Sequence, residues 1–304
     1  MSFIVGADEA GRLDRVLVAR FPGIGRRRWA ALFADGGVAV DGARARKGDR
    51  VAAGARVTLR EPPASGDALA PLSEPDLALE ILHVDERLVA IGKPAGVPSL
   101  PLRAGETGTA ANALVARFPE CAGLGRDPRE AGLVHRLDRG TSGVLVAARD
   151  AETWQSLRRA FSDGDVDKHY LALAVGAVAD GSTDAPLRAA GHRAALARAD
   201  ERGSLPAFTS WRAIAAGPGV TLLAVAAATG RMHQVRAHLA ARGAPLVGDP
   251  LYGGPTELIL DGERLAVPLP FLHADRLTLP GPLEIRAPLP AERTALLSRL
   301  GIPA

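Results

Sequence analysis

The sequence has very little cysteine and no long apolar run. Its single cysteine, Cys121, excludes a disulfide framework and a metal site built from thiolates. No hydrophobic stretch approaches the length of a membrane span, and the first ten residues lack the basic start of a signal peptide. We therefore expect a cytoplasmic protein. Its 304 residues, 47% of them hydrophobic, can build the core of one large domain or two smaller ones.

Positive and negative charges nearly balance over the whole chain, but the positive charges are unevenly distributed along it. The formal net charge of the chain is only +3. Residues 1–60, however, hold twelve basic and six acidic side chains, so this segment carries +6 and the rest of the chain carries −3. A surplus confined to the N-terminal fifth predicts an electrostatic attraction to phosphate groups at that end.

A stretch with the composition of a linker divides the chain at residues 61–75. It contains four prolines and one glycine and shows little hydrophobic periodicity. The sequence therefore predicts two domains, residues 1–60 and residues 76–304. In the first, apolar residues recur at helical spacing over 12–21 and 26–34, and short strands follow around an Asp-Gly turn.

The second domain mixes strand and helix patterns without a strict βαβ rhythm. Strands are expected at 79–82, 88–91 and 169–175, and helices at 109–118 and 150–161, with Asp150 as the N-cap of the second helix. Residues 254–268 resemble an exposed loop without a readable role. This arrangement favours an α+β fold with a mixed sheet over a doubly wound one.

The nonapeptide over residues 135–143 places Asp138 between two arginines. Short apolar runs at 132–134 and 144–146 are typical of buried strand ends, so the charged residues are expected on a loop between strands. Neighbouring guanidinium groups favour the ionised carboxylate, which suits a nucleophile or a base. A surface cluster of ion pairs is the alternative interpretation.

The nonapeptide resembles the signature of the RluA family of RNA pseudouridine synthases. The resemblance extends from about residue 75 to about residue 290, because further motifs follow in the family's order. It implies a pseudouridine-synthase fold, with a largely antiparallel central sheet, flanking helices and an RNA cleft. The matching segments are His135 to Asp138, Thr141 to Gly143, Lys93 to Gly96, Lys168 and Tyr170 with Gly176, Thr229 to Arg236, Gly248-Asp249 with Tyr252-Gly253, and Leu272 to Ala274.

Residues 1–60 resemble the S-four-like RNA-binding domain named after a small-subunit ribosomal protein. The match is looser, since Gly25 stands where a serine is usual and Asp41 where an asparagine is usual. A solvated arginine face is the alternative to RNA binding. The resemblance implies phosphate contacts from Arg26, Arg27, Arg28 and Lys47.

The resemblance also implies roles for four catalytic residues. Asp138 would be the nucleophile, adding either to the uracil ring or to the anomeric carbon of the ribose. Arg136 would occupy the space that the flipped base leaves. Tyr170 would stack on the extruded uracil, and Arg236 would be the ion-pair partner of Asp138.

Further residues are expected to contact the substrate or to shape the site. Arg236 is expected on a helix that Thr229 caps, with Met232, Val235 and Leu239 on its apolar face. Arg231 is expected to contact phosphate and Leu272 to pack near the base. The remaining expected substrate contacts are His135 and Gln234.

The reaction implied by the resemblance needs no cofactor and no metal, since nothing is oxidised and no group is transferred in. Metal-dependent hydrolysis is disfavoured because His233 and His238 are five residues apart, not the four of the helical His-Glu-x-x-His motif. Serine hydrolysis fails because the segment around Ser142 lacks the nucleophile-elbow pattern. A catalytically inactive RNA-binding protein remains the alternative. Ribosomal RNA is the first expected substrate and transfer RNA the second, with no membrane and no obligatory protein partner.

Overall fold

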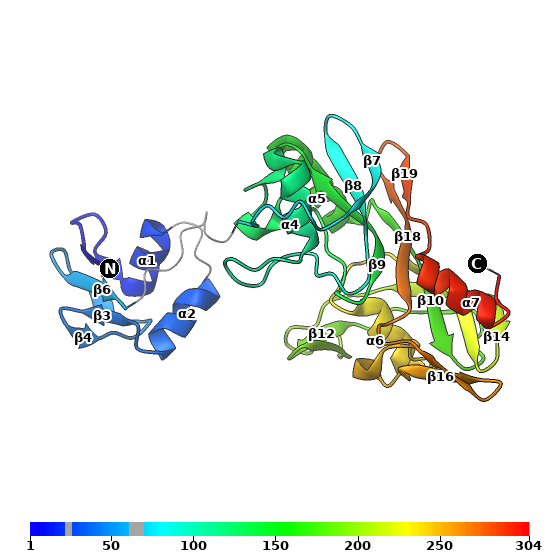
Figure 1. The fold of residues 1–304 in the computed structure, drawn as a ribbon. Coiled ribbons are helices and arrows are strands. Elements are labelled where there is room, and N and C mark those ends of the chain that lie inside the picture. The colour runs from blue at the N-terminus through cyan, green and yellow to red at the C-terminus, as the bar shows by residue number, and fades with distance from the viewer. Residues whose placement is uncertain (22–25, 61–69, 304) are drawn as a thin grey trace.

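The computed structural model describes residues 1–21, 26–60 and 70–303, with the backbone only for residues 26–28 and 31 (Figure 1). The N-terminal part contains a four-stranded sheet in the order β1-β6-β3-β4. Its elements are β1 (Ser2–Ile4), β2 (Gly11–Arg12), α1 (Leu13–Arg20), α2 (Arg26–Ala34), β3 (Val38–Val40), β4 (Ala43–Arg44), β5 (Arg50–Val51) and β6 (Arg56–Leu59).

This N-terminal part has a hydrophobic core of its own. Leu13 and Leu17 of α1 pack with Trp29 of α2 against Val57 of β6. The two helices predicted from apolar spacing are confirmed in position. The Asp-Gly turn at residues 41–42 joins β3 to β4 with both residues at positive φ, a conformation that favours this pair of residue types.

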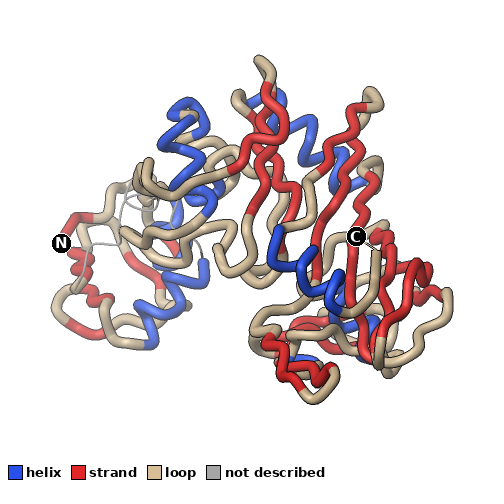
Figure 2. Tube along the Cα trace, turned by 45° about the vertical axis from the view of Figure 1, so that its right-hand side comes forward, coloured by secondary structure: helices blue, strands red, loops and turns tan. Residues whose placement is uncertain are grey.

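The larger part is built on a nine-stranded sheet, whose strands run side by side in Figure 2. In chain order they are β7 (Glu80–Val84), β8 (Leu88–Lys93), β9 (Ser142–Ala148), β10 (Asp167–Val175), β11 (Gly181–Thr183), β14 (Thr209–Gly217), β15 (Val220–Ala227), β18 (Leu272–Leu279) and β19 (Leu283–Arg286). Their spatial order is β11-β14-β15-β10-β18-β9-β8-β7, with β19 paired to β18. The pairing of β18 with β9 is parallel and the other described pairings are antiparallel, so the predicted α+β fold with a mixed, largely antiparallel sheet is confirmed.

Two helices cover opposite faces of β9. Because successive side chains of a strand point to opposite faces, Val144 and Val146 pack with α5 (Ala151–Asp163), and Leu145 packs with α4 (Ala110–Arg117). Both helices lie close to their predicted positions, and Asp150 caps α5 by accepting a hydrogen bond from the Thr153 amide. The remaining elements are η1 (Pro119–Cys121), η2 (Pro128–Glu130), β12 (Leu187–Ala190), β13 (Arg193–Leu196), α6 (Gln234–Ala241), η3 (Pro250–Tyr252), β16 (Glu257–Leu260), β17 (Glu263–Ala266) and α7 (Ala291–Arg299).

The parallel pairing between β9 and β18 is short and tight. It has two residue pairs in register, His273 with Ser142 and Ala274 with Gly143. Gly143 has φ 117°, and a Cβ atom there would overlap the carbonyl oxygen of Ala274. The Ser142 hydroxyl lies 2.8 Å from His273 Nδ1 and ties the two strands together at the same point. Only glycine permits this approach of the two backbones.

One local expectation is wrong, and a second is confirmed only in part, since residues 132–134 are buried and form an isolated bridge to β9. Residues 254–268 contain the β16–β17 hairpin, and Leu265 of β17 and the following residue Val267 are buried. Its turn is Asp261-Gly262, again with both residues at positive φ, so the sequence did carry a hairpin signal. Residues 132–134 are not a full strand, although Val134 donates a backbone hydrogen bond to Val146.

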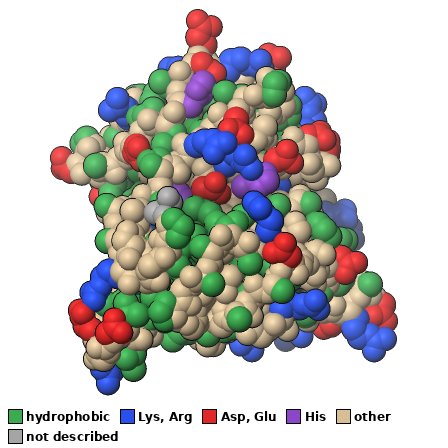
Figure 3. Space-filling view, turned by 90° about the vertical axis from the view of Figure 1, so that its right-hand side faces the viewer, with side chains coloured by type: hydrophobic (Ala, Val, Ile, Leu, Met, Phe, Trp, Pro, Cys, Tyr) green, Lys and Arg blue, Asp and Glu red, His purple; other side chains and the backbone are tan. Residues whose placement is uncertain are grey.

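The outer surface of the larger part mixes charges of both signs. On the face in Figure 3, acidic and basic side chains lie interspersed. The ion pairs of the larger part include Arg276–Glu284 and Arg299–Glu263. In the described part of the chain, no helix is long and apolar enough to cross a membrane.

Candidate active site

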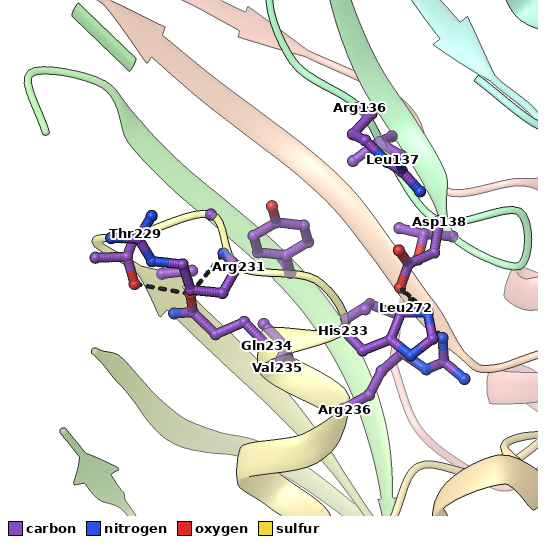
Figure 4. A pocket seen from close by; sticks show the side chains of 14 residues that line it. Arg136, Leu137, Asp138, Thr229, Arg231, His233, Gln234, Val235, Arg236 and Leu272 are labelled. Atoms are coloured by element: carbon purple, nitrogen blue, oxygen red, sulfur yellow. Dashed lines mark hydrogen bonds and ion pairs between the residues drawn. The ribbon is translucent and has the colours of Figure 1, made fainter. Parts of the chain in front are cut away.

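A pocket forms where the loop carrying Asp138 faces α6 and the strands β10 and β18. Figure 4 shows Asp138 pointing across this pocket toward Arg236. Of the eight residues predicted to act on or contact the substrate, seven line the pocket, and His135 does not. The lining residues are Arg136, Leu137, Asp138, Thr141, Tyr170, Ala227, Thr229, Gly230, Arg231, His233, Gln234, Val235, Arg236 and Leu272.

Buried polar contacts fix the backbone of the Asp138 loop. The Ser99 hydroxyl accepts a hydrogen bond from the Leu137 amide at 3.0 Å and donates one to the Leu137 carbonyl at 2.8 Å. On the far side of the loop, Arg293 donates to the Gly140 carbonyl at 3.1 Å and also binds the carbonyl of Leu272. Since loops held at several points move little, the carboxylate of Asp138 is presented in a defined direction.

Asp138 is paired with a cation that is distant in sequence. Arg236 Nη1 lies 3.2 Å from Asp138 Oδ2, and the same guanidinium binds both oxygens of Asp249 at 2.7 and 2.8 Å. Burial opposes the charge of Arg236, but the hydrogen bonds and charge of Asp249, followed by those of Asp138, outweigh it and raise the pKa of this guanidinium. The arginine is therefore a fixed cation between two carboxylates.

The arginines next to Asp138 in sequence do not serve as its partners. Arg136 is exposed at the rim of the pocket, and Arg139 Nε donates to the Gly96 carbonyl at 2.9 Å. The expectation that these two neighbours hold the charge of Asp138 is therefore corrected in favour of Arg236.

The start of α6 also differs from the expectation. The helix begins at Gln234, with His233 as its N-cap in the left-handed conformation (φ 53°), so Thr229 does not cap it. Met232 precedes the helix and is 38% exposed, so it does not belong to an apolar face with Val235. These differences arise because the segment before α6 turns sharply to bring His233 toward Asp138.

Gln234 and Arg231 lie in the pocket wall, where both already have protein partners. The Gln234 side chain accepts from Thr229 Oγ1 and from the Arg231 amide, and donates to the Phe208 carbonyl and to Thr209. Since its hydrogen-bonding capacity is used within the protein, Gln234 holds the loop that shapes the pocket. Arg231 Nε donates to the Pro206 carbonyl at 2.9 Å.

His135 lies outside the pocket, contrary to its predicted contact with substrate. Its Nε2 accepts a hydrogen bond from the Val146 amide at 3.0 Å, and its ring stacks on Phe161 with centroids 4.7 Å apart. Burial, together with the charges of Lys168 and Arg158, lowers the pKa of His135 to about 3. The neutral ring therefore acts as a packed part of the core beside β9.

Tyr170 and Leu272 supply the apolar side of the pocket. Tyr170 lies on β10 opposite Val225 of β15, at the point where the β10–β18 pairing shifts register. Such irregularities re-aim a side chain, and here the ring faces the pocket. Leu272 is 4% exposed at the start of β18. Burial and the nearby Asp138 raise the pKa of the Tyr170 phenol.

Several residues of the site were present in the motifs but received no role from the sequence. Asp249 is fully buried and anchors Arg236, and Tyr252 lies 3.1 Å from His233. Lys93 is 1% exposed and donates to backbone carbonyls, including that of Arg139 in the Asp138 loop. Burial lowers the pKa of Lys93 to about 7, although the charge of Asp138 opposes this shift.

The predicted RNA-binding residues lie in the N-terminal part. The side chains of Arg26, Arg27 and Arg28 lie outside the described residues, although the backbone places all three at the start of α2. Lys47 lines a separate hollow with Arg12, Arg15 and Trp29. Among the residues with described positions, no group of three or more His, Cys, Asp or Glu side chains could hold a metal ion.

Comparison with known proteins places this site in a family. Residues 87–241 match the model of the RNA pseudouridylate synthase family. The chain is 35% identical over 302 residues to ribosomal large subunit pseudouridine synthase D of Pseudomonas aeruginosa, covering 95% of this chain and 92% of the relative. It is 37% identical over 294 residues to an uncharacterized RNA pseudouridine synthase of Mycobacterium bovis, covering 92% and 91% of the two chains.

A solved structure agrees with these relatives. The structure described as human RNA pseudouridylate synthase domain containing 4 superposes with a TM-score of 0.58 at 26% identity. The match covers 74% of this chain and 95% of the human one. The fold, the family model and the extent of identity lead to one conclusion: the chain belongs to the RNA pseudouridine synthases, and it is an isomerase of uridine in RNA.

Proposed function

We propose that this enzyme converts specific uridines of large-subunit ribosomal RNA into pseudouridine, with Asp138 as its nucleophile. The observation that carries the proposal is the geometry of Asp138. Its carboxylate lies in a pocket, 3.2 Å from a guanidinium that Asp249 holds from the other side. The substrate assignment rests on relatives that are named for the large ribosomal subunit.

The chemistry fits the residues around the pocket. The bond between the anomeric carbon and N1 of uracil breaks, the ring turns, and a bond forms from the same carbon to C5. Asp138 acts either on the uracil ring or on the anomeric carbon, and both routes use the same carboxylate as the nucleophile. Tyr170 and Leu272 offer flat and apolar surfaces for the detached ring, and Arg136 at the rim occupies the gap in the RNA stack.

We assign RNA attraction to a separate domain of residues 1–60, joined by residues 61–75 to a catalytic domain of residues 76–304. The positive surplus of the first segment supports the assignment, as does the likeness of its helices and hairpin to an S-four-like domain. Its contacts to phosphate would come from Arg26, Arg27, Arg28 and Lys47. The enzyme would act in the cytoplasm without an obligatory protein partner.

The test of the catalytic proposal is Asp138→Asn. This change keeps the shape of the side chain but removes its charge, so tritium release from C5-labelled uridine in RNA should fall to background. RNA binding should persist, because loss of a negative charge does not weaken attraction to a polyanion. The matched control is Asp200→Asn, whose side chain is 78% exposed and lies outside the pocket. Tritium release by Asp138→Asn at the wild-type rate would refute the assignment.

The substrate is tested by mapping pseudouridines across the total RNA of a deletion strain. Loss of modified positions in large-subunit ribosomal RNA, restored by the wild-type gene and not by Asp138→Asn, supports the proposal. Loss confined to transfer RNA would replace the ribosomal substrate with the alternative one.

A further inference from the structure

His233 occupies an unusual position beside Asp138. It is the N-cap of α6 and adopts a left-handed conformation (φ 53°) that non-glycine residues seldom take. Its Nε2 atom lies 3.8 Å from Asp138 Oδ2, too far for a hydrogen bond, and its ring points toward the pocket (Figure 4). Strained backbone of this kind is often found where a side chain must be aimed at a ligand.

Tyr252 determines which nitrogen of His233 carries the proton. The Tyr252 hydroxyl accepts a hydrogen bond from the Ala194 amide at 2.8 Å and donates its one proton to the Ala194 carbonyl at 3.1 Å. Its contact with His233 Nδ1 at 3.1 Å is therefore satisfied when that nitrogen is the donor. In the neutral ring, Nε2 is then left with a free lone pair that faces the pocket.

The other titratable side chains of the pocket are poor proton acceptors. Tyr170 keeps its proton at neutral pH, because burial and the nearby Asp138 raise the pKa of its phenol. Asp138 is already assigned to nucleophilic attack. The remaining titratable lining residues apart from His233 are permanent cations, namely Arg136, Arg231 and Arg236.

We propose that His233 is the general base that takes the proton from C5 of the uracil. The proposal rests on the pseudouridine synthase function and adds a residue to its mechanism. When the anomeric carbon has bonded to C5, the C5–H bond must break so that its electron pair restores the ring double bond. The proton passes from C5 to His233 Nε2. The N1 atom released from the sugar then takes up a proton from the imidazolium, directly or through water, which returns His233 to its neutral form. One C–H bond is thus exchanged for one N–H bond, without an oxidant or reductant.

The charges around His233 suit this step. Burial, opposed by the attraction of Asp138, lowers the pKa of His233 below its usual 6.5, so the ring is a free base at neutral pH. After proton transfer, the imidazolium lies beside the Asp138 carboxylate, which stabilises it. The rate of the C5 step should therefore decline as the pH falls through the lowered pKa of His233. The ionisable groups that face His233 are Asp138, Arg136, Arg236, Asp249 and Tyr252.

The test compares the wild-type enzyme with His233→Gly in single-turnover reactions on RNA that carries hydrogen or deuterium at C5. Glycine adopts φ 53° without strain and leaves a space for a free imidazole. The rate should fall by about 10²- to 10⁴-fold. Deuterium should slow the variant more than the wild type, because C5 proton loss becomes limiting. Added imidazole should restore part of the rate, and RNA affinity should not change.

Two further variants make the result decisive. His233→Asn also tolerates the left-handed conformation and should show the same loss and the same isotope effect. His192→Gly removes a histidine from an exposed turn outside the pocket and should behave as the wild type, with no response to imidazole. A slow His233→Gly with neither an isotope effect nor imidazole rescue, or one with the wild-type rate, would overturn the proposal. Failure of the wild type to form pseudouridine would instead overturn the proposed function, and this inference with it.

Discussion

The N-terminal part and the larger part of the molecule use charge in opposite ways. In the first, basic side chains outnumber acidic ones two to one, and those whose positions are described lie at the surface, as with Arg12, which is 47% exposed. In the second, two of the cations that shape the site are buried and bound to fixed partners. Arg236 is 7% exposed between two carboxylates, and Lys93 is 1% exposed against backbone carbonyls.

This difference separates the long-range attraction of RNA from the chemistry of the catalytic site. Exposed charges act over a distance of about a Debye length, roughly 8–10 Å at physiological salt, and are weakened by added ions. Buried ion pairs are screened far less, and they act mainly by fixing the positions of the charged groups in the site. We therefore expect salt to alter RNA binding through the N-terminal part, and mutation of the buried pairs to alter turnover and folding stability.

The largest effect on turnover outside Asp138 and His233 is expected from Arg236→Met. The change leaves the Asp138 and Asp249 carboxylates without their common cation in a buried position, where an unpaired carboxylate readily takes up a proton. Turnover should be abolished at neutral pH and return in part at alkaline pH. A tritium-release profile against pH measures this. Asp138→Asn should gain no alkaline activity, and the same behaviour in Arg236→Met would contradict the prediction.

The cost of removing a charge should depend on burial. Asp249→Ala leaves Arg236 without its bidentate carboxylate partner and should lower the free energy of unfolding by about 3–5 kcal/mol. The matched surface pair is Arg264–Glu257, with side chains 73% and 48% exposed. Glu257→Ala should cost less than about 1 kcal/mol. Urea unfolding measures the loss of stability in both variants. Equal losses would show that burial does not determine the cost of removing a charge.

The N-terminal surplus should govern the salt dependence of binding. Removing residues 1–60 should leave a folded catalytic part with weaker RNA affinity and a shallower salt slope. A milder test is the triple variant R12Q/R15Q/K47Q, which keeps the fold but neutralises the three cations of the N-terminal hollow. If all three contact phosphate, the slope of log K against log salt should become shallower by about 2. Filter binding at several salt concentrations measures this slope, and an unchanged slope would refute the role of this surface in RNA binding.

The smallest effect concerns His135, a half-buried neutral group whose folded pKa is about 3. The unfolded chain, with a usual value of 6.5, binds more protons between these limits, so stability is lost as pH falls from 6.5 toward 3. Between pH 6 and pH 4, wild-type stability should fall by about 1 kcal/mol per pH unit more than that of His135→Gln. Urea unfolding at each pH measures the difference, and parallel curves for the two proteins would disprove it.

Local sequence signals predicted the elements whose causes are local. The cap at Asp150 and the apolar stripe of Trp154 and Leu157 were sufficient for α5, and Asp41-Gly42 for a turn. The β16–β17 hairpin could have been found from Asp261-Gly262, but its short strands are flanked by charged residues, which favoured the interpretation as a loop.

Contacts between segments that lie far apart in the chain were harder to predict from the sequence. The neighbours of Asp138 in the chain suggested local arginines, whereas its partner Arg236 lies 98 residues away. The family resemblance supplied that partner, but not the anchoring role of Asp249 or the left-handed cap at His233. These features depend on how the sheet brings segments together, and helix spacing alone placed Met232 and Thr229 wrongly for the same reason.

Because the parallel contact between β9 and β18 is short, the geometry of the site depends on correct assembly of the sheet. Asp138 enters from the β9 side and Arg236 from the side of β10, β14 and β15, so their ion pair spans the joint between two half-sheets. Because Leu277 and Leu279 of β18 share one hydrophobic core with Val144 and Val146 of β9, a tilt at Gly143 would loosen this core and separate the two charges at the same time. The ion pair of the site therefore forms only when the two half-sheets are correctly joined, which links catalytic competence to correct assembly of the whole sheet.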